Sequence, residues 1–218
     1  ALAIRPDYAE AHYNLGIALK ELGKLDEAVE CCREALALQP GFAEAYRNLG
    51  NVLQEQGKLD EAVGSYRKAL SLKPDCADAH DNLLFALNFH HGVGREEVYR
   101  ASQEYEARVG APLRPLWRAH DNDRNSSRRL RVGYVSPDFR RHAVAYFAEP
   151  VLANHDKAQV EIYCYSEARQ EDEVTARFRQ LAEHWHSTVG LSDEAAAEMI
   201  REHRIDILVD LAGHTAKN

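Results

Sequence analysis

Two short segments of the chain collect the residue types that acid–base chemistry uses. Each follows a short β-rich run, RLRVGYV or IDILV, that is typical of a buried strand. The first segment is SPDFRRHA, with Ser136, Asp138, Arg140, Arg141 and His142, and the second is DLAGHTAKN, with Asp210, Gly213, His214 and Thr215. An imidazole titrates near neutral pH, so a histidine in such a segment is a candidate acid–base group. Neither segment is a G-x-G-x-x-G loop or a P-loop, which argues against a dehydrogenase or an ATPase.

Strands and helices alternate from residue 129 onward. The runs RLRVGYVS, VEIYCYS, HSTVGL and IDILVDLAGHT predict strands, and AVAYFAEPVLANH, DEVTARFRQLAEHW and DEAAAEMIREH predict helices, the last with Ser192 as its N-cap. Such alternation indicates a parallel sheet with helices on both faces. Ligands bind at the carboxyl ends of strands in these sheets, where both polar segments lie. Three or four strands are fewer than a doubly wound domain usually has, so we expect residues 129–218 to be the first part of a larger domain.

The first half of the chain is a repeat. Proline recurs at Pro6, Pro40 and Pro74, each 34 residues after the last, and GKLDEA occurs at residues 23–28 and again at 57–62. Each unit contains two amphipathic stretches of helical spacing with a glycine at the turn between them. This period and pattern resemble the tetratricopeptide repeat. The fold class predicted for the chain is therefore a multidomain one, an all-α tetratricopeptide-repeat solenoid followed by part of an α/β Rossmann-like parallel-sheet domain.

Three parts follow from these patterns. Residues 1–109 are predicted to form the solenoid, with a degenerate third unit and a helical cap at its carboxyl end. Residues 110–128 are polar and contain two prolines, which is typical of a linker, and the arginines of RNSSRRLR are interpreted as solvated rather than as a phosphate-binding patch. Residues 129–218 form the α/β part. Because the chain starts at ALAIRPDYAE without a methionine, we expect it to begin within a longer protein.

Asparagine recurs with the same period, at Asn14, Asn48 and Asn82. Asparagine is a mediocre helix former, so helix propensity does not explain its presence in the first helix of each unit. First helices line the concave face of such a solenoid, and a ladder of carboxamides suits the backbone of an extended peptide. The alternative is that each asparagine bonds the neighbouring repeat and holds the stack.

Composition excludes several classes of protein. The 218 residues carry a net charge of −8, without the basic face that a nucleic-acid-binding protein normally has. No segment is long and apolar enough to predict a membrane span, and the amino terminus does not have the pattern of a signal peptide. The four cysteines form no C-x-x-C pair, which favours free thiols in a reducing compartment such as the cytoplasm.

Three segments of the second half, RLRVGYVSPDFRRHAVAYF, VEIYCYS and IDILVDLAGHTA, resemble the start of the catalytic region of O-linked N-acetylglucosamine transferases and of the related Spindly-type protein O-fucosyltransferases. Both groups place tetratricopeptide repeats directly before two Rossmann-like halves, so the tandem order strengthens the resemblance. The resemblance implies an inverting transfer of a sugar from a nucleotide donor to Ser or Thr of acceptor proteins, without a metal or another cofactor. It favours UDP-N-acetylglucosamine over GDP-fucose as the donor.

The resemblance also assigns residues. In the pattern V-S-x-x-F-x-x-H, which starts at Val135, His142 is the family's active-site histidine, although Ala143 stands where many members have proline. The donor cleft would include Asp210, His214 and Thr215, and the acceptor polypeptide would lie along Asn14, Asn48 and Asn82. Since the family holds the donor nucleotide mainly with its other half, residues 1–218 are expected to be inactive alone.

Other interpretations stay open at this point. The repeats and a non-catalytic α/β module would make a protein-interaction scaffold, and a different α/β enzyme joined to repeats would share the same pattern. His184 and His186 flank Trp185 and resemble half of a metal site, but the sequence offers no third ligand beside them, so no metal site is predicted.

Overall fold

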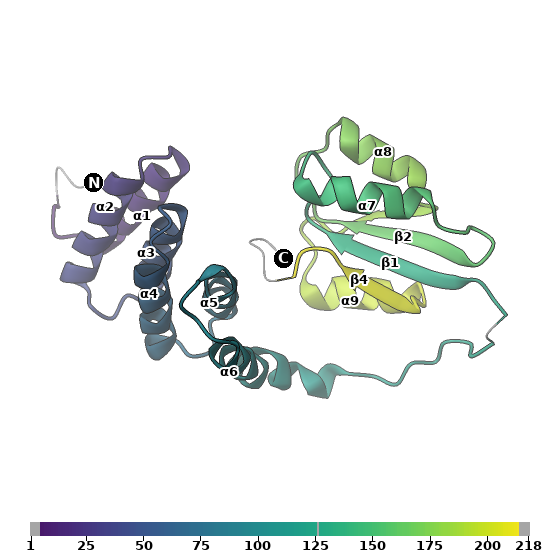
Figure 1. Cartoon of the computed structure of the whole chain (residues 1–218), viewed down its shortest axis with the longest axis horizontal. Helices are drawn as coiled ribbons and strands as arrows, with labels where there is room; N and C mark the ends of the chain where they lie inside the picture. Colours follow the sequence, from purple (N-terminus) through teal and green to yellow (C-terminus); the bar gives the residue numbers. More distant parts are fainter. Residues whose placement is uncertain (1–4, 126, 214–218) are drawn as a thin grey trace. The chain divides into compact units, whose positions relative to one another are not determined.

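The computed structural model describes residues 5–125 and 127–213 (Figure 1). These residues form two compact units, which divide between Trp117 and Arg118. The first unit is helical and the second contains a sheet with helices. Of the described helices, none is both long and apolar enough to cross a membrane.

The helical unit consists of antiparallel pairs. Its helices are α1 (Ala9–Glu21), α2 (Leu25–Leu38), α3 (Ala43–Glu55), α4 (Leu59–Leu72), α5 (Ala77–Phe89) and α6 (Arg95–Tyr105), followed by a π-helical turn (Glu106–Gly110) and a 3₁₀ segment (Ala111–Leu116). Each helix packs against the next, and α1 also contacts α3 as α3 contacts α5. The turns inside the first two pairs use Gly23 and Gly57 at φ of 73° and 75°, which glycine adopts at little cost. The predicted repeats are confirmed, and the helical path continues seven residues into the segment predicted as a linker.

The close approach of α3 and α4 depends on a glycine. A Cβ atom at Gly50 would lie 2.4 Å from Cε1 of Tyr66, whose side chain is fully buried. The Tyr66 hydroxyl donates to Asn51 Oδ1 at 2.9 Å and lies 3.2 Å from Gln54 Oε1, so the hydroxyl end of the ring is bound to α3. A small residue is therefore required where the ring crosses α3.

Leucine recurs with the 34-residue period at positions 15, 49 and 83, and the first of these differs from the other two. Leu49 and Leu83 are 8% and 5% exposed, whereas Leu15 is 40% exposed. No helix precedes α1 in the described part of the chain, so Leu15 has no neighbouring repeat against which to pack. Repeat units bury their apolar faces against neighbours, which explains the difference.

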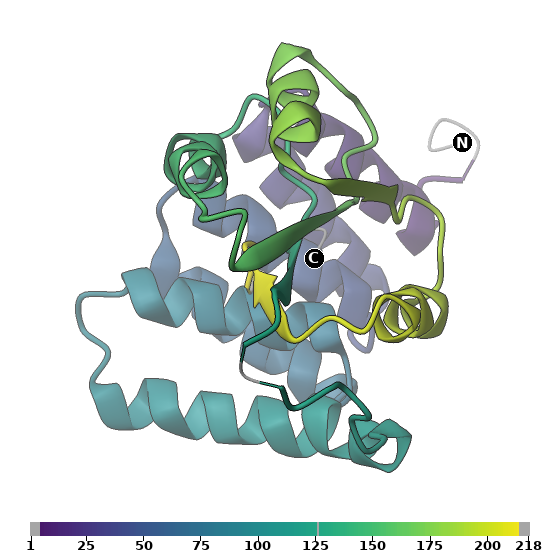
Figure 2. The same cartoon turned by 90° about the vertical axis from the view of Figure 1, so that its right-hand side faces the viewer.

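The second unit is built on a four-stranded parallel sheet in the order β3-β2-β1-β4. The strands are β1 (Leu130–Ser136), β2 (Val160–Ser166), β3 (His184–Ser187) and β4 (Ile207–Asp210), and the helices are α7 (Ala143–Ala153), α8 (Glu173–Leu181) and α9 (Asp193–Glu202). Helices α7 and α8 cover one face, and α9 lies on the other (Figure 2). The predicted parallel sheet is confirmed; its third strand begins two residues before HSTVGL and ends earlier than predicted.

The core of this unit lies between the sheet and the α7–α8 face. Phe139, Leu152, Ile162 and Phe178 are completely buried there. Helix α9 begins at the predicted cap, since the Ser192 hydroxyl oxygen accepts the Ala195 N–H at 3.3 Å.

Candidate functional site

The carboxyl edge of the sheet carries a row of side-chain oxygens. Each described strand ends in a serine or an aspartate that closes the turn after it, because its oxygen accepts the backbone N–H two residues further on. These strand-ending residues are Ser136, Ser166, Ser187 and Asp210. The register places the three serines side by side, and Asp210 opposite Val135. The sequence singled out Ser136 and Asp210; the other two serines were missed, and their signal was the same position at the end of an apolar run.

The loop after β1 holds His142 at this edge. Phe139 anchors the loop in the core, with ring centroids 5.0 Å from Phe178 and 5.5 Å from Trp185. The three residues after it are exposed, and His142 serves as the N-cap of α7. A buried aromatic residue thus fixes one end of the loop and a helix start fixes the other.

The His142 ring has polar neighbours on one side. Its Nδ1 accepts the Val144 N–H at 3.4 Å, and Oδ2 of Asp138 lies 3.5 Å from the same nitrogen. Asp138 is held in turn, because its backbone N–H donates to Ser136 Oγ and its other oxygen pairs with Arg140 at 3.0 Å. In the described residues Nε2 has no hydrogen-bond partner, and the side chain is 42% exposed. The imidazole therefore presents one nitrogen for a bound molecule while the other faces the protein.

The remaining predicted cleft residues are only partly described. Asp210 lies at the end of β4, where its two oxygens accept the N–H groups of Ala212 and Gly213 at 2.8 and 3.0 Å. Strand β4 pairs with β1, so Asp210 and the start of the His142 loop share one edge of the sheet. His214 and Thr215 lie outside the described residues.

The three asparagines of the solenoid have different surroundings. Asn14 is exposed. Asn48 is 6% exposed and donates to Cys32 Sγ at 3.3 Å, and Asn82 donates to Asn51 Oδ1 at 3.0 Å. Asn48 and Asn82 thus bond the preceding unit, as the stacking interpretation expects. Asn48 is also less solvated than a side chain on an open concave surface would be.

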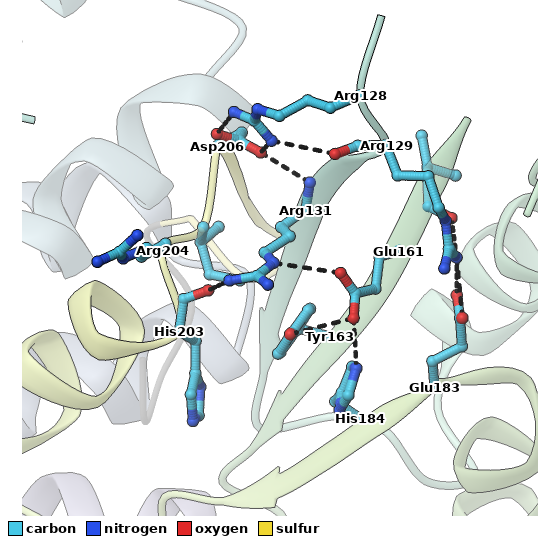
Figure 3. Close-up of polar contacts among 12 residues, drawn as sticks. Arg128, Arg129, Arg131, Glu161, Tyr163, Glu183, His184, His203, Arg204 and Asp206 are labelled. Atoms are coloured by element: carbon cyan, nitrogen blue, oxygen red, sulfur yellow. Dashed lines mark hydrogen bonds and ion pairs between the residues drawn. The ribbon is translucent and has the colours of Figure 1, made fainter. Parts of the chain in front are cut away.

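A second polar cluster, which the sequence did not predict, lies at the amino ends of the strands (Figure 3). Asp206 accepts both terminal nitrogens of Arg128, at 2.5 and 2.6 Å, together with the amide of Asn122 and the backbone N–H of Arg131. The Arg128 guanidinium holds the pKa of this carboxyl far below its ordinary value despite its burial. Arg128 of RNSSRRLR is therefore not solvated as predicted, since it is bound to the turn before β4, whereas Arg124 is exposed.

The two histidines that resembled half of a metal site take part in ring packing instead. His184 Nε2 lies 2.8 Å from Glu161 Oε1, and the ring stacks on Tyr163 with centroids 4.1 Å apart. His186 lies 4.3 Å, centroid to centroid, from His203. Among residues 5–125 and 127–213, no three potential metal ligands are grouped around one position.

Comparisons with known proteins agree with this architecture. Residues 79–218 match the family described as Glycosyl transferase family 41, and residues 9–42 and 43–76 match the tetratricopeptide repeat. The chain is also similar to a solved structure, a mutant of the O-GlcNAc transferase of Thermobaculum terrenum, with a TM-score of 0.86 and 38% identity. The similarity covers 98% of this chain and 41% of that one.

Curated relatives give the same result over a shorter range. The probable UDP-N-acetylglucosamine–peptide N-acetylglucosaminyltransferase SPINDLY of Oryza sativa subsp. japonica is 36% identical over 139 residues, which is 62% of this chain and 15% of the relative. The UDP-N-acetylglucosamine–peptide N-acetylglucosaminyltransferase of Caenorhabditis elegans is 33% identical over 105 residues, 46% of this chain and 9% of the relative. The chain thus spans about 15% of the length of the SPINDLY proteins it matches. Since the family match covers well over half of its residues, the chain belongs to glycosyl transferase family 41.

Proposed function

We propose that the chain is part of a protein O-glycosyltransferase that moves a sugar from a nucleotide donor to Ser or Thr of acceptor proteins. The observation that carries this proposal is His142, an exposed imidazole at the carboxyl edge of a parallel sheet, in a loop anchored by a buried phenylalanine. Family membership and the activities named for the relatives support N-acetylglucosamine, carried by UDP, as the sugar. Their names also favour a protein acceptor.

The proposed transfer is inverting. The acceptor hydroxyl oxygen bonds to the anomeric carbon on the face opposite the leaving nucleoside diphosphate, and the hydroxyl proton must leave. With the hydrogen on Nδ1, where it would face Asp138 Oδ2, His142 Nε2 would take this proton. With Nδ1 accepting the Val144 N–H instead, the Nε2–H would orient the two reactants. The backbone N–H groups at the start of α7, beside His142, would favour the negative charge of the donor phosphates. Asp210 would complete the cleft with His214 and Thr215. No metal takes part in the proposed reaction.

The solenoid is proposed to hold the acceptor polypeptide along Asn14, Asn48 and Asn82. Asn14 is exposed, so its carboxamide is accessible to a peptide backbone. The present partner of Asn48 is a thiol sulfur, which is a weak acceptor, but the carboxamide is only 6% exposed, so a bound peptide would also have to displace the side chains that cover it. We place the protein in the cytoplasm, and we expect residues 1–218 alone to show no turnover.

Replacement of His142 in the full-length protein tests the proposal. His142→Asn keeps an N-cap for α7 but removes the imidazole, so transfer should fall about 10²–10⁴-fold while the helix stays capped. His142→Ala should lose activity equally and be slightly less stable. His214→Ala should cost less, because its segment follows a different strand. Transfer is measured with UDP-N-acetylglucosamine and GDP-fucose side by side. Full activity of His142→Asn would refute the role of His142, whereas no transfer of either sugar by the unchanged full-length protein would favour the scaffold interpretation.

A further inference from the structure

One carboxylate joins the His142 loop to the start of α8. Oδ2 of Asp172 accepts the backbone N–H of Arg141 at 2.7 Å. Oδ1 of the same carboxylate accepts the N–H groups of Val174 and Thr175 at 2.9 and 3.0 Å, as the N-cap of α8. The Thr175 hydroxyl accepts the Asp172 N–H at 3.1 Å and completes a capping box. The two carboxylate oxygens therefore have separate partners, one in the helix and one in the loop.

The loop partner is the residue directly before His142. Between Phe139, which is fully buried, and the start of α7, residues 140–142 are exposed. Their backbone N–H groups bond within the loop at Arg140, which donates to the Asp138 carbonyl at 2.7 Å, and outside it at Arg141, which donates to Asp172. Hydrogen bonds to a charged acceptor are stronger than neutral ones. The Arg141 N–H is also the largest influence that lowers the pKa of Asp172, which keeps this acceptor charged at neutral pH.

Helix α8, which carries Asp172 at its N-cap, is itself fixed in the core of the unit. Val174, Thr175 and Phe178 are buried in the core of the unit. Phe178 packs against Phe139, so the loop is attached to α8 three times: through an aromatic pair, through Asp172, and through an ion pair between the side chains of Arg141 and Glu173. All three attachments lie at the start or within the first two turns of the same helix.

We propose that Asp172 is a positioning residue that sets the place of His142 by holding the Arg141 N–H. The inference rests on the proposed function, because the position of His142 matters only if this side chain acts on the reactants. An imidazole that must meet a reacting hydroxyl tolerates little displacement, because errors of about 1 Å can cost about 10²-fold in rate.

Asp172→Ser separates the two tasks of the carboxylate. A serine hydroxyl still caps α8, but it has no second oxygen to reach Arg141. Asp172→Thr, with the other capping hydroxyl, is a second variant in case the first folds poorly. Ser192→Ala is the matched control, since it removes the cap of α9, which has no described bond to the His142 loop.

Amide hydrogen exchange of the 218-residue chain, followed by NMR, gives a readout that does not depend on activity. In Asp172→Ser the Arg141 amide should exchange about 10- to 100-fold faster, while the amides of Val174 and Thr175 keep their protection. In the full-length enzyme, kcat should fall about 10-fold or more with KM for donor and acceptor unchanged. Ser192→Ala should change neither the Arg141 amide nor kcat.

The outcomes are distinct. Unchanged exchange at Arg141 in both Asp172 variants would show that the bond does not hold the loop, and the proposal would be overturned. Faster exchange with normal kcat, while His142→Asn is inactive, would overturn the positioning role and leave the proposed function standing. If His142→Asn itself is fully active, His142 is not the acid–base group and the role of Asp172 fails with it. If the unchanged full-length protein transfers neither sugar, the proposed function itself fails.

Discussion

The contact between Gly50 and Tyr66 predicts opposite effects for two glycine-to-alanine changes in neighbouring helices. In Gly50→Ala the new Cβ would meet Cε1 of Tyr66 at 2.4 Å, a distance that real Cβ atoms do not show. In Gly64→Ala, in the exposed middle of α4, the new Cβ would have no atom within 4 Å. Gly16→Ala, at the equivalent place one unit earlier, is intermediate, since its nearest atom is Cys32 Sγ at 3.2 Å.

The magnitudes follow from these distances. Alanine inside a helix is favoured over glycine by about 0.5–1 kcal/mol, so Gly64→Ala should stabilise the helical unit by about that amount. At Gly50 the same gain is outweighed, because overpacking a filled core costs about 1–3 kcal/mol and displacing the ring also breaks the Tyr66–Asn51 hydrogen bond, worth about 1 kcal/mol. Gly50→Ala should therefore destabilise the unit by about 1–3 kcal/mol.

The assay is urea unfolding of the full chain, followed by far-ultraviolet circular dichroism, which is dominated by the six-helix unit. The two units need separate transitions in the fit, since a chain with two units does not have to unfold in one step. If Gly50→Ala is as stable as the unchanged chain while Gly64→Ala is more stable, the close approach of α3 and α4 is not as tight as described and the reasoning fails.

Two further predictions concern the α/β unit. Phe139→Ala should lower its stability by about 3–5 kcal/mol and change the fluorescence of Trp185, which packs on that ring; unaltered emission with an unaltered urea midpoint would contradict the anchoring role. Burial, followed by repulsion from His203, lowers the pKa of His186 below its ordinary value of 6.5, and burial lowers that of His203. The unfolded chain therefore binds protons first, so stability present above pH 6.5 should decline as the pH falls below it. Urea midpoints at pH 7.5 and 5.5 test this, and His186→Gln should reduce the difference.

The architecture was predictable because its signals are local and periodic. A 34-residue period and a glycine at each turn predict paired helices from the sequence of each unit, without knowledge of what packs against that unit. Alternating strand and helix patterns specify a parallel sheet in the same way. Exposure at Leu15 was not predictable from the pattern, because burial at that position depends on whether another helix lies beside it.

The site was predictable only in outline. The end of β1 placed His142 at the carboxyl edge, but nothing in SPDFRRHA indicates that a residue 31 positions after Arg141 would bond its backbone. The cluster around Asp206 was missed for the same reason, since Arg128 precedes it by 78 positions. Contacts of this kind depend on register and on the ends of helices, which sequence patterns place only to within a few residues.

The backbone geometry at both ends of the second helix is almost the same in the first two pairs. Lys24 and Lys58, which precede α2 and α4, have φ and ψ of −85° and 65° and of −84° and 66°. Gln39 and Lys73, which follow these helices, have −136° and 85° and −137° and 84°. A duplicated copy of residues 25–58 would therefore enter and leave along backbone paths that its neighbours already use. Tandem duplication or loss of one whole unit can lengthen or shorten the solenoid in equal steps. The length of the solenoid can therefore change, in evolution or by protein engineering, without any new loop.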